Sequence, residues 1–212
     1  MGIFLKKNIG ESTIVGLWEI TETVDDLFSK LRLNAEENKL FGDFRNDLRK
    51  LHWLSYRNLL KELLPPEEYS HVIYDEFGKP YLQYNSHHLS VSHAGKFSAA
   101  IINKNSSVGI DIEVTHPKIH KIVHKFLSEK EAKNISPENY TDSLYVCWGA
   151  KEALYKLYGK RNLLFQENIF LEPFVYSGNG IIKGAIKIKN FKQKFNLHYE
   201  KIEDYMLVYT VD

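Results

Sequence analysis

Hydrophobic and polar positions along this chain follow the periods of short strands and amphipathic helices. The longest helical pattern covers 43–64, where apolar residues from Leu48 to Leu60 recur on one side and Pro65-Pro66 ends the run. Several shorter apolar runs end at turn-forming residues, which is typical of strands. The chain is therefore predicted to mix helices and strands. We expect strands at 13–21, 71–74, 97–103, 108–113 and 205–211, more strands elsewhere in 168–211, and helices at 43–64, 119–127 and 139–158.

Helix starts and one helix end are marked by capping residues. A hydroxyl or amide side chain followed three residues later by an acid predicts a capping box, because each side chain satisfies a backbone N–H of the first turn. Gly159 follows the last predicted helix at the position where a left-handed residue commonly ends a helix. The predicted boxes pair Thr23 with Asp26, Asn34 with Glu37, and Ser128 with Glu131.

Composition indicates a soluble, cytoplasmic protein. The 212 residues are 43% hydrophobic, with a net charge of +1, so no strongly basic field favours nucleic acid as a partner. A single cysteine, Cys147, excludes an internal disulfide and suits a reducing compartment. No apolar stretch reaches the length of a membrane span, and the first residues lack the pattern of a secretory leader.

Two acids stand side by side in the predicted strand at 108–113. Asp111 and Glu113 are two residues apart, and side chains at that spacing point to the same face of a strand. Neighbouring carboxylates repel unless a positive charge lies between them, and Mg²⁺ prefers oxygen ligands. The alternative is a solvated acidic face on an edge strand.

A further acid and a lysine lie on the helix predicted at 139–158. Glu152 and Lys156 are four residues apart and therefore share a face of that helix. Glu152 could complete a metal site and Lys156 could meet an anionic substrate. Without the acidic strand, the pair would be interpreted as a surface ion pair.

Together these two segments resemble the 4′-phosphopantetheinyl transferase superfamily, in its long, single-chain form. The resemblance rests on Val-Gly-Ile-Asp-Ile-Glu at 108–113 and Trp-x-x-Lys-Glu-Ala-x-x-Lys at 148–156. It implies an α+β fold of two similar subdomains, a pseudo-dimer with the cofactor cleft between them, divided into 1–104 and 105–212. It also implies an enzyme that moves the phosphopantetheine arm of coenzyme A to a serine of an acyl or peptidyl carrier protein, acting as a monomer.

The resemblance also implies the roles of the acidic cluster. Asp111, Glu113 and Glu152 would hold Mg²⁺, or Mn²⁺ in its place. Glu152 would act as catalytic base, directly or through a water, and Lys156 would neutralise the phosphate charge of coenzyme A.

Three segments before residue 105, one position after the acidic strand, and Lys156 would bind coenzyme A by the same resemblance. Locally, Gly-Lys-Pro at 78–80 also fits an ordinary hairpin turn, and the histidine of the Ser-His pair at 92–93 fits a structural residue. That pair cannot easily form a hydrolase nucleophile and base, because neighbours on a strand point opposite ways. Arg57 fits a structural ion pair better than a coenzyme A contact. The coenzyme A residues are expected to be Arg49, Gly78, Lys79, Pro80, Ser92, His93, Lys96, Thr115 and Lys156.

Two further features complete the sequence-based expectations. Gly149 stands where similar proteins usually carry Ser, Cys or Thr; it is expected to touch no proposed ligand and to weaken the helix locally. A lysine-rich predicted hairpin fits either the lysines that protect edge strands or a surface for an acidic carrier protein. Its lysines are Lys183, Lys187, Lys189, Lys192 and Lys194.

Two other function classes use similar residues. Acidic pairs with a nearby lysine also serve metal-dependent nucleases and phosphodiesterases, but the near-zero net charge disfavours a nucleic-acid substrate. A carrier-binding relative without catalytic activity would be expected to lack some of the four cluster residues, all of which are present here.

Overall fold

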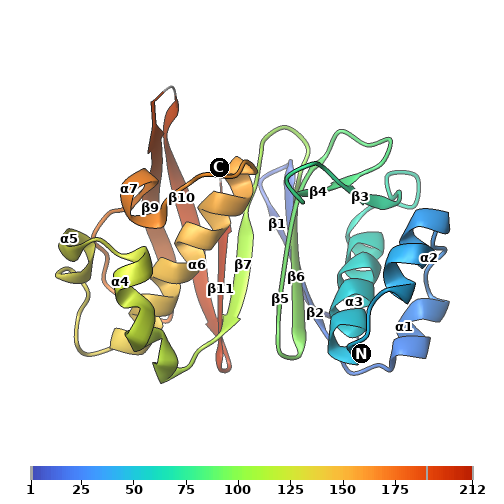
Figure 1. Ribbon diagram of the computed structural model, residues 1–212, viewed down its shortest axis with the longest axis horizontal. Helices are drawn as coiled ribbons and strands as arrows, with labels where there is room; N and C mark the ends of the chain where they lie inside the picture. The colour runs from blue at the N-terminus through green and yellow to red at the C-terminus, as the bar shows by residue number, and fades with distance from the viewer. Residues whose placement is uncertain (1, 190, 212) are drawn as a thin grey trace. The chain divides into compact units, whose positions relative to one another are not determined.

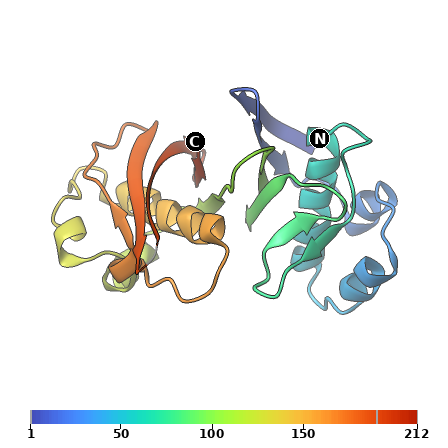
Figure 2. The ribbon, with the colours of Figure 1, turned by 90° about the horizontal axis from the view of Figure 1, so that it is seen from above.

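The computed structural model describes residues 2–189 and 191–211, and the chain divides into two compact units, Met1–Asn105 and Ser106–Asp212. Each unit consists of an antiparallel sheet with one long helix across a face, which can be followed in two orientations (Figures 1 and 2). The α+β class expected from the sequence is confirmed.

The first unit contains a four-stranded antiparallel sheet in the order β1-β2-β6-β5. Strand β1 was not expected from the sequence, where three of its eight positions are Lys or Asn; it pairs with β2 from Gly2↔Glu19 to Ile9↔Thr13. Leu17 on β2 and Phe97 and Ile101 on β6 are buried in the centre of the sheet. The strands are β1 (Gly2–Ile9), β2 (Thr13–Glu19), β5 (His88–Ala94) and β6 (Phe97–Asn103).

Helix α3 covers this sheet and contributes six buried residues to the hydrophobic core of the unit. It begins at Asp47, four residues later than expected, because the side chain of Asn46 accepts the Arg49 N–H and caps it there. Leu48 was expected to face inward, but it lies in the first turn with 51% of its surface exposed. Both capping boxes expected before α3 are present. The helices are α1 (Val24–Ser29), α2 (Ala35–Gly42) and α3 (Asp47–Leu63).

A two-stranded hairpin, β3 (Val72–Tyr74) and β4 (Pro80–Leu82), follows α3. Gly78 adopts a φ of +87° in its turn, a conformation that strongly favours glycine. The hairpin thus places Gly-Lys-Pro at its tip and at the start of β4.

The second unit contains a five-stranded sheet in the order β7-β11-β10-β9-β8. Strand β9 begins at Asn179 and pairs with β10 along its whole length, from Asn179↔Glu200 to Ile188↔Phe191. The strands are β7 (Ile110–Val114), β8 (Ile169–Leu171), β9 (Asn179–Ile188), β10 (Phe191–Ile202) and β11 (Tyr205–Thr210).

Helix α6 lies across one face of this sheet and ends at Gly159, which has a φ of +68° as expected for a left-handed cap. The helix expected at 119–127 is instead a 3-10 turn followed by one α-helical turn, because Pro117 starts the segment and Leu127 leaves the helical conformation. The capping box at Ser128 is confirmed. The helical segments are η1 (Pro117–Ile122), α4 (Val123–Phe126), α5 (Glu129–Ala132), α6 (Tyr140–Tyr158) and α7 (Phe165–Asn168).

Each unit has its own hydrophobic core. In the first, Trp53, Leu54 and Leu60 of α3 pack with Leu89 of β5; in the second, residues of α6 pack with β9, β10 and β11. Within the part of the chain that the structure describes, none of the helices has the length and apolar character needed to span a bilayer.

Candidate active site

The acidic strand β7 lies directly beneath helix α6, and a glycine allows the close approach. A Cβ atom on Gly109 would lie 1.8 Å from the carbonyl oxygen of Ala153, on the helix backbone. Any larger residue would push the strand away from the helix. Gly109 therefore sets the distance between the strand that carries Asp111 and the helix that carries Glu152 and Lys156.

Asp111 and Lys156 form an ion pair across this contact. Asp111 lies opposite Val208 on β11 and is only 3% exposed. Lys156 Nζ lies 2.7 Å from Asp111 Oδ1 and donates to the Ile110 carbonyl oxygen at 3.0 Å. The structure therefore brings together two residues that are 45 positions apart in the sequence.

Glu113 lies two residues further along β7 and also faces α6. Its Oε1 accepts a hydrogen bond from Trp148 Nε1 at 3.2 Å, so the tryptophan of the second motif orients this carboxylate. Burial raises the pKa of Glu113, and the nearby charge of Asp111 raises it further. The two acids thus act on one another as their spacing predicted.

Glu152 joins the same electrostatic cluster from the helix. Burial raises its pKa to about 7, with the charges of Asp111 and Glu113 also raising it and that of Lys156 opposing them. Three carboxylates and one ammonium leave an excess of negative charge in a partly buried place. A carboxyl group of this kind can exchange a proton near neutral pH.

The donor set of this cluster suits a hard divalent cation, since all three acidic side chains offer oxygen. Burial, and the charges of the neighbouring carboxylates, raise the pKa values of Glu113 and Glu152. Over residues 2–189 and 191–211, however, no three or more His, Cys, Asp or Glu side chains are arranged to hold a metal ion. One oxygen of Asp111 contacts Lys156 and one oxygen of Glu113 contacts Trp148. The assignment of a metal to these residues therefore belongs to the proposal below.

Gly149 has a role that the sequence did not indicate. It was expected to touch no proposed ligand, yet a Cβ atom there would lie 3.7 Å from Asp111 Oδ2 and 2.7 Å from Cγ2 of Val208. The expectation was wrong because the glycine faces the sheet at the acidic strand. The small residue lets α6 pack against Val208 and Asp111.

Lys151 of the second motif was given no role from the sequence, and it is a buried structural residue. Its side chain is fully buried, with Nζ 3.0 Å from Glu131 Oε2 and 2.8 Å from the carbonyl oxygens of Phe165 and Ile169. Glu131 also closes the capping box of α5. Lys151 therefore fastens α5 and α7 to the helix that presents Glu152.

Thr115 directly follows β7, where its hydroxyl bonds to the backbone of the β10–β11 turn. The hydroxyl donates to the Asp204 carbonyl oxygen at 3.0 Å and accepts from Lys201 Nζ at 2.8 Å. Lys201 also contacts Asp142 at 2.6 Å. Thr115 thus lies near the acidic strand as expected, within a network that anchors the end of that strand.

In the first unit, the Gly-Lys-Pro turn is built around Asp75. Its Oδ1 accepts the backbone N–H groups of Phe77 and Lys79 at 2.9 and 2.8 Å, and Gly78 is open to solvent. Burial lowers the pKa of Lys79, with Asp75 opposing this effect. The turn therefore presents backbone groups and a partly desolvated ammonium, next to Pro80 at the start of β4.

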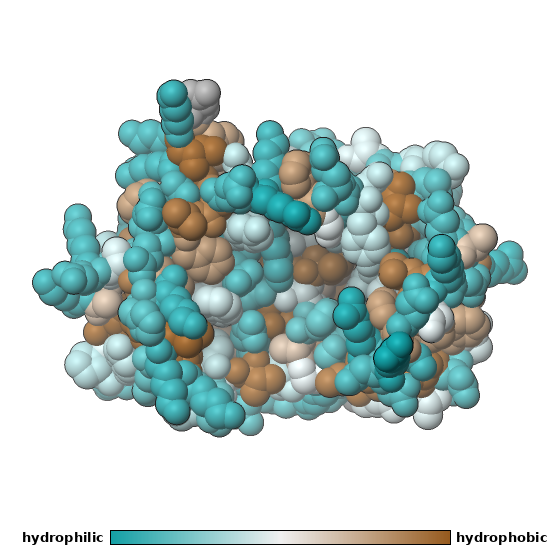
Figure 3. All heavy atoms as spheres, viewed as in Figure 1, coloured by the Kyte–Doolittle hydropathy of each residue, from teal (hydrophilic) through white to brown (hydrophobic). Residues whose placement is uncertain are grey.

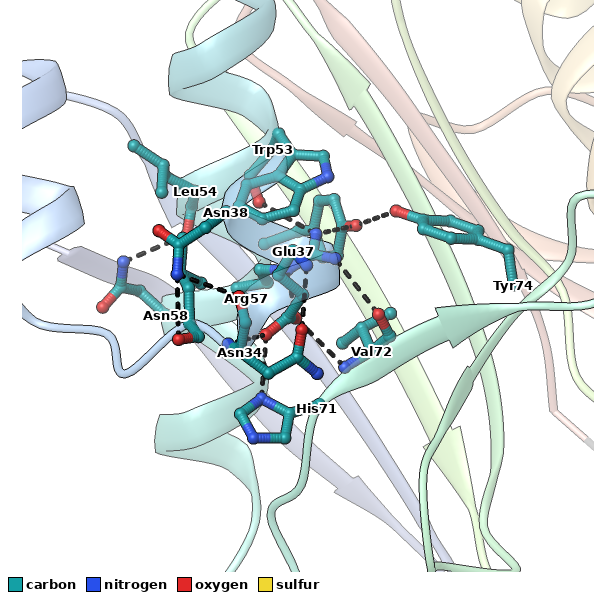
Figure 4. A network of polar contacts seen from close by, with 12 residues as sticks. Asn34, Glu37, Asn38, Trp53, Leu54, Arg57, Asn58, His71, Val72 and Tyr74 are labelled. Carbon is teal, nitrogen blue, oxygen red and sulfur yellow. Dashed lines mark hydrogen bonds and ion pairs between the residues drawn. The ribbon is translucent and has the colours of Figure 1, made fainter. Parts of the chain in front are cut away.

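The base of this hairpin is held by a buried network on Arg57, drawn in Figure 4. The fully buried Arg57 contacts Glu37 at 3.1 Å and donates to the Val72 carbonyl oxygen at 3.3 Å, while Glu37 also contacts His71 Nδ1 at 2.8 Å. Tyr56 bonds to both Arg57 and Tyr74. The structural ion pair expected for Arg57 is present, and it joins α2, α3 and β3.

The Ser-His motif ends β5, at the edge of the four-stranded sheet. Ser92 is buried, whereas His93 is exposed and its ring stacks on that of His52 from α3. Lys96 lies 2.8 Å from Glu19, an ion pair that the sequence did not indicate. Arg49 is exposed one helical turn before His52, with its guanidinium 4.8 Å from the Phe44 ring.

The two units thus place the expected residues in two groups. Strand β7 and helix α6 bring together Asp111, Glu113, Glu152 and Lys156. In the first unit, α3 carries Arg49 and also His52, whose ring stacks on His93, and the Gly-Lys-Pro turn forms a hairpin of its own.

The acidic strand β7 and the helix α6 lie within a segment that matches a known protein family. Residues 107–209 match the family model of the 4′-phosphopantetheinyl transferase superfamily. This segment is therefore similar to members of that superfamily, and the resemblance found in the sequence is confirmed.

Individual relatives carry the same name. A 4′-phosphopantetheinyl transferase of Bacillus subtilis is 33% identical over 89 residues, 40% of this chain and 39% of that protein. The 4′-phosphopantetheinyl transferase AcpT of Escherichia coli O157:H7 is 29% identical over 117 residues, 52% of this chain and 59% of the relative. A putative 4′-phosphopantetheinyl transferase of Synechocystis is 26% identical over 141 residues, 60% and 57% of the two chains. The matches thus span less than two thirds of each of these relatives.

Proposed function

We propose that this protein transfers the 4′-phosphopantetheine arm of coenzyme A to a serine of an apo carrier protein, with Mg²⁺ as cofactor. The observation that carries the proposal is the cluster of Asp111, Glu113, Glu152 and Lys156, inside the segment that matches the family. The transfer joins the serine oxygen to the β-phosphorus of coenzyme A and breaks the bond to 3′,5′-ADP. The serine proton must leave as negative charge grows on the phosphate oxygens.

Glu152 is suited to receive that proton. Its raised pKa, about 7, makes it a stronger base than an ordinary carboxylate while a substantial fraction stays ionised at neutral pH. It can act directly or through a water. Its position on α6, one turn before Lys156, places base and cation on the same helical face.

Lys156 supplies the fixed positive charge of the site. Its ammonium is held by Asp111 and the Ile110 carbonyl oxygen, so it is positioned before substrate arrives. Asp111, Glu113 and Glu152 would hold the divalent cation, which supplies charge neutralisation at the reacting phosphate. Trp148 would keep Glu113 oriented through the hydrogen bond described above.

Coenzyme A binding is assigned to the first unit and to Thr115. The Gly78–Pro80 turn offers backbone groups and the Lys79 ammonium to the nucleotide, while His93, Ser92 and the following turn with Lys96 offer donors to the phosphates. Arg49 offers a guanidinium one helical turn before His52, whose ring stacks on His93. Lys96 must exchange its contact with Glu19 for the phosphate to take part.

An intact-mass measurement tests the proposed reaction. A bacterial apo acyl carrier protein and a peptidyl carrier domain are each incubated with this protein, coenzyme A and Mg²⁺. We expect the carrier to gain one phosphopantetheine arm and 3′,5′-ADP to appear in equal amount. A carrier whose acceptor Ser is replaced by Ala is the control. No gain on either carrier, with a known transferase active in parallel, would overturn the proposal.

The lysine-rich hairpin is the surface we assign to the acidic carrier. Its two strands are interior in the sheet order, but β8 pairs with β9 only at 184–186 and β11 pairs with β10 only at 197–202. The lysines lie outside these paired stretches, so protection of an exposed strand edge is the alternative explanation for them. Lys187 and Lys192 lie directly opposite one another and both are exposed, an arrangement of like charges that an acidic partner relieves. Hydrophilic side chains project from the tip of this hairpin, at the upper left of Figure 3.

Charge reversal distinguishes carrier docking from coenzyme A binding. We expect Lys187→Glu with Lys192→Glu to raise the KM for the carrier about tenfold and to leave the KM for coenzyme A unchanged. The matched control is Lys130→Glu with Lys133→Glu, two exposed residues on and just after α5. Equal KM values for the carrier in the two double variants would show that the hairpin does not take part in carrier recognition.

A further inference from the structure

A buried histidine on α3 supports the exposed histidine of the Ser-His motif. The side chain of His52 is 6% exposed, and its ring lies parallel to that of His93, with centroids 4.3 Å apart and an angle of 15° between the planes. Ring faces at this distance are in full contact. The exposed ring of His93 is therefore stacked on the ring of the buried His52.

His52 also holds the turn that follows His93. Its Nε2 lies 2.8 Å from the carbonyl oxygen of Gly95, and because a carbonyl only accepts, Nε2 must carry the hydrogen. Gly95 has a φ of +50°, so the turn depends on a conformation that favours glycine. One side chain thus fixes both the ring plane of His93 and the backbone two residues later.

The helix that carries His52 is itself fixed to the sheet. One turn later, Ser55 Oγ lies 2.7 Å from Ser98 Oγ, and both serines are fully buried. Ser98 is the cross-strand partner of His93 in the sheet. The hydrogen bond between Ser55 and Ser98 therefore ties the helix that carries His52 to the strand paired with His93.

We propose that His52 is a positioning residue for the coenzyme A phosphate site, where it orients the His93 imidazole and the 94–96 turn toward the phosphates. This inference rests on the proposed function and adds a residue that the motifs did not include. No local pattern marks His52, which stands between Leu51 and Trp53 in an otherwise apolar part of the helix. Its role depends on contacts with residues more than 40 positions away.

Two variants separate the two contacts of His52. His52→Phe keeps a ring under His93 but loses the donor to Gly95, whereas His52→Gln keeps a donor and loses the ring; His52→Ala loses both. We expect His52→Ala to raise the Kd for coenzyme A and for 3′,5′-ADP about 10- to 100-fold, since displaced binding groups lose affinity steeply. Phe and Gln should give intermediate values. The kcat at saturating coenzyme A should fall much less than the affinity.

Asn58→Ala is the matched control, because it removes buried hydrogen bonds to the Leu27 and Leu54 carbonyl oxygens from the same helix without touching His52, His93 or Gly95. Calorimetry gives the Kd values, thermal unfolding gives the stability of each variant, and NMR gives the ring signals of His93, which should move in His52→Ala and stay in Asn58→Ala. If the wild type binds coenzyme A and His52→Ala matches Asn58→Ala in affinity, this inference is wrong while the proposed function stands. If the wild type binds no coenzyme A, both are overturned.

Discussion

Three glycines illustrate how single residues set the geometry of this protein. Gly109 and Gly149 are not turn residues. A Cβ atom on Gly109 would lie 1.8 Å from the backbone oxygen of Ala153, and a Cβ atom on Gly149 would lie 2.7 Å from Cγ2 of Val208. Gly78, by contrast, has free space around it and is required by its φ of +87° alone. Only the last of these roles can be predicted from the local sequence, because the first two depend on which residue of a distant strand or helix lies opposite.

The packing at Gly149 leads to a stability prediction. Alanine has the higher helix propensity by up to about 1 kcal/mol, yet Gly149→Ala should destabilise the protein by about 1–3 kcal/mol because its Cβ meets Val208. Val208→Ala in the same chain should recover much of that loss. Urea unfolding of the two single variants and the double variant measures the coupling.

Gly109→Ala is the control for this cycle. Its Cβ would meet the backbone oxygen of Ala153, so truncating a side chain gives no relief, and we expect a larger loss of stability. Additive effects of Gly149→Ala and Val208→Ala would show that the helix shifts freely at Gly149.

Glu152 should make stability depend on pH when no divalent cation is present. Its pKa rises from an ordinary 4.5 to about 7 on folding, so the folded state keeps a proton that the unfolded state releases between these values. The free energy of unfolding contributed by this group therefore falls as pH rises through that window. Because the residue is partly exposed, we expect a loss of about 1 kcal/mol.

Glu152→Gln removes that dependence, and chelator-treated protein unfolded in urea at pH 5 and pH 8 provides the test. The variant should match the wild type at pH 5 and exceed it at pH 8. If the unfolding free energy of the wild type instead rises relative to that of the variant between pH 5 and pH 8, the raised pKa of Glu152 is contradicted.

At the scale of elements, buried polar networks fasten the segments that carry the site. Arg57 joins two helices to β3 in the first unit, and Lys151 joins two short helices to α6 in the second. Both charged side chains are fully buried and each contacts a carboxylate, so removing one partner leaves a buried charge behind. These networks hold the Gly-Lys-Pro hairpin and the Glu152 helix in place.

Glu37→Gln tests the first network. The variant keeps the shape of the side chain but removes the charge opposite Arg57, and we expect a loss of about 3–5 kcal/mol in unfolding free energy. Glu36→Gln, the exposed neighbour on the same helix, is the control and should change stability by less than about 0.5 kcal/mol. Equal stability of the two variants would show that the buried pair contributes little to the fold.

The elements themselves followed the sequence where local chemistry determines them. The three capping boxes and the left-handed cap at Gly159 depend on residues within four positions, and all are present. Strand β1 was not predicted, because its polar surface residues hide the alternation and its pairing with β2 makes it a strand. The apolar spacing of 119–127 suggested one helix, but the segment forms a 3-10 helix followed by a single α-helical turn.

At the scale of the whole molecule, the two α+β units carry different parts of the proposed function. The second unit holds the acidic cluster and the whole family match, and the first holds most of the residues assigned to coenzyme A. The acidic cluster could be predicted from spacing and resemblance together, since a strand face and a helix face are both local patterns. The contributions of His52, Lys151 and Gly149 could not, because each depends on a partner in another element.

The central claim is that Asp111 and its neighbours carry out the transfer, and the transfer rate of Asp111 variants measures it most directly. We expect Asp111→Ala and the isosteric Asp111→Asn to slow single-turnover transfer to a carrier by about 10²–10⁴, while Glu138→Ala, an exposed acid elsewhere in the same unit, keeps the wild-type rate. Circular dichroism and thermal unfolding establish that each variant is folded at the assay temperature. Transfer by folded Asp111→Asn at the wild-type rate would contradict the account.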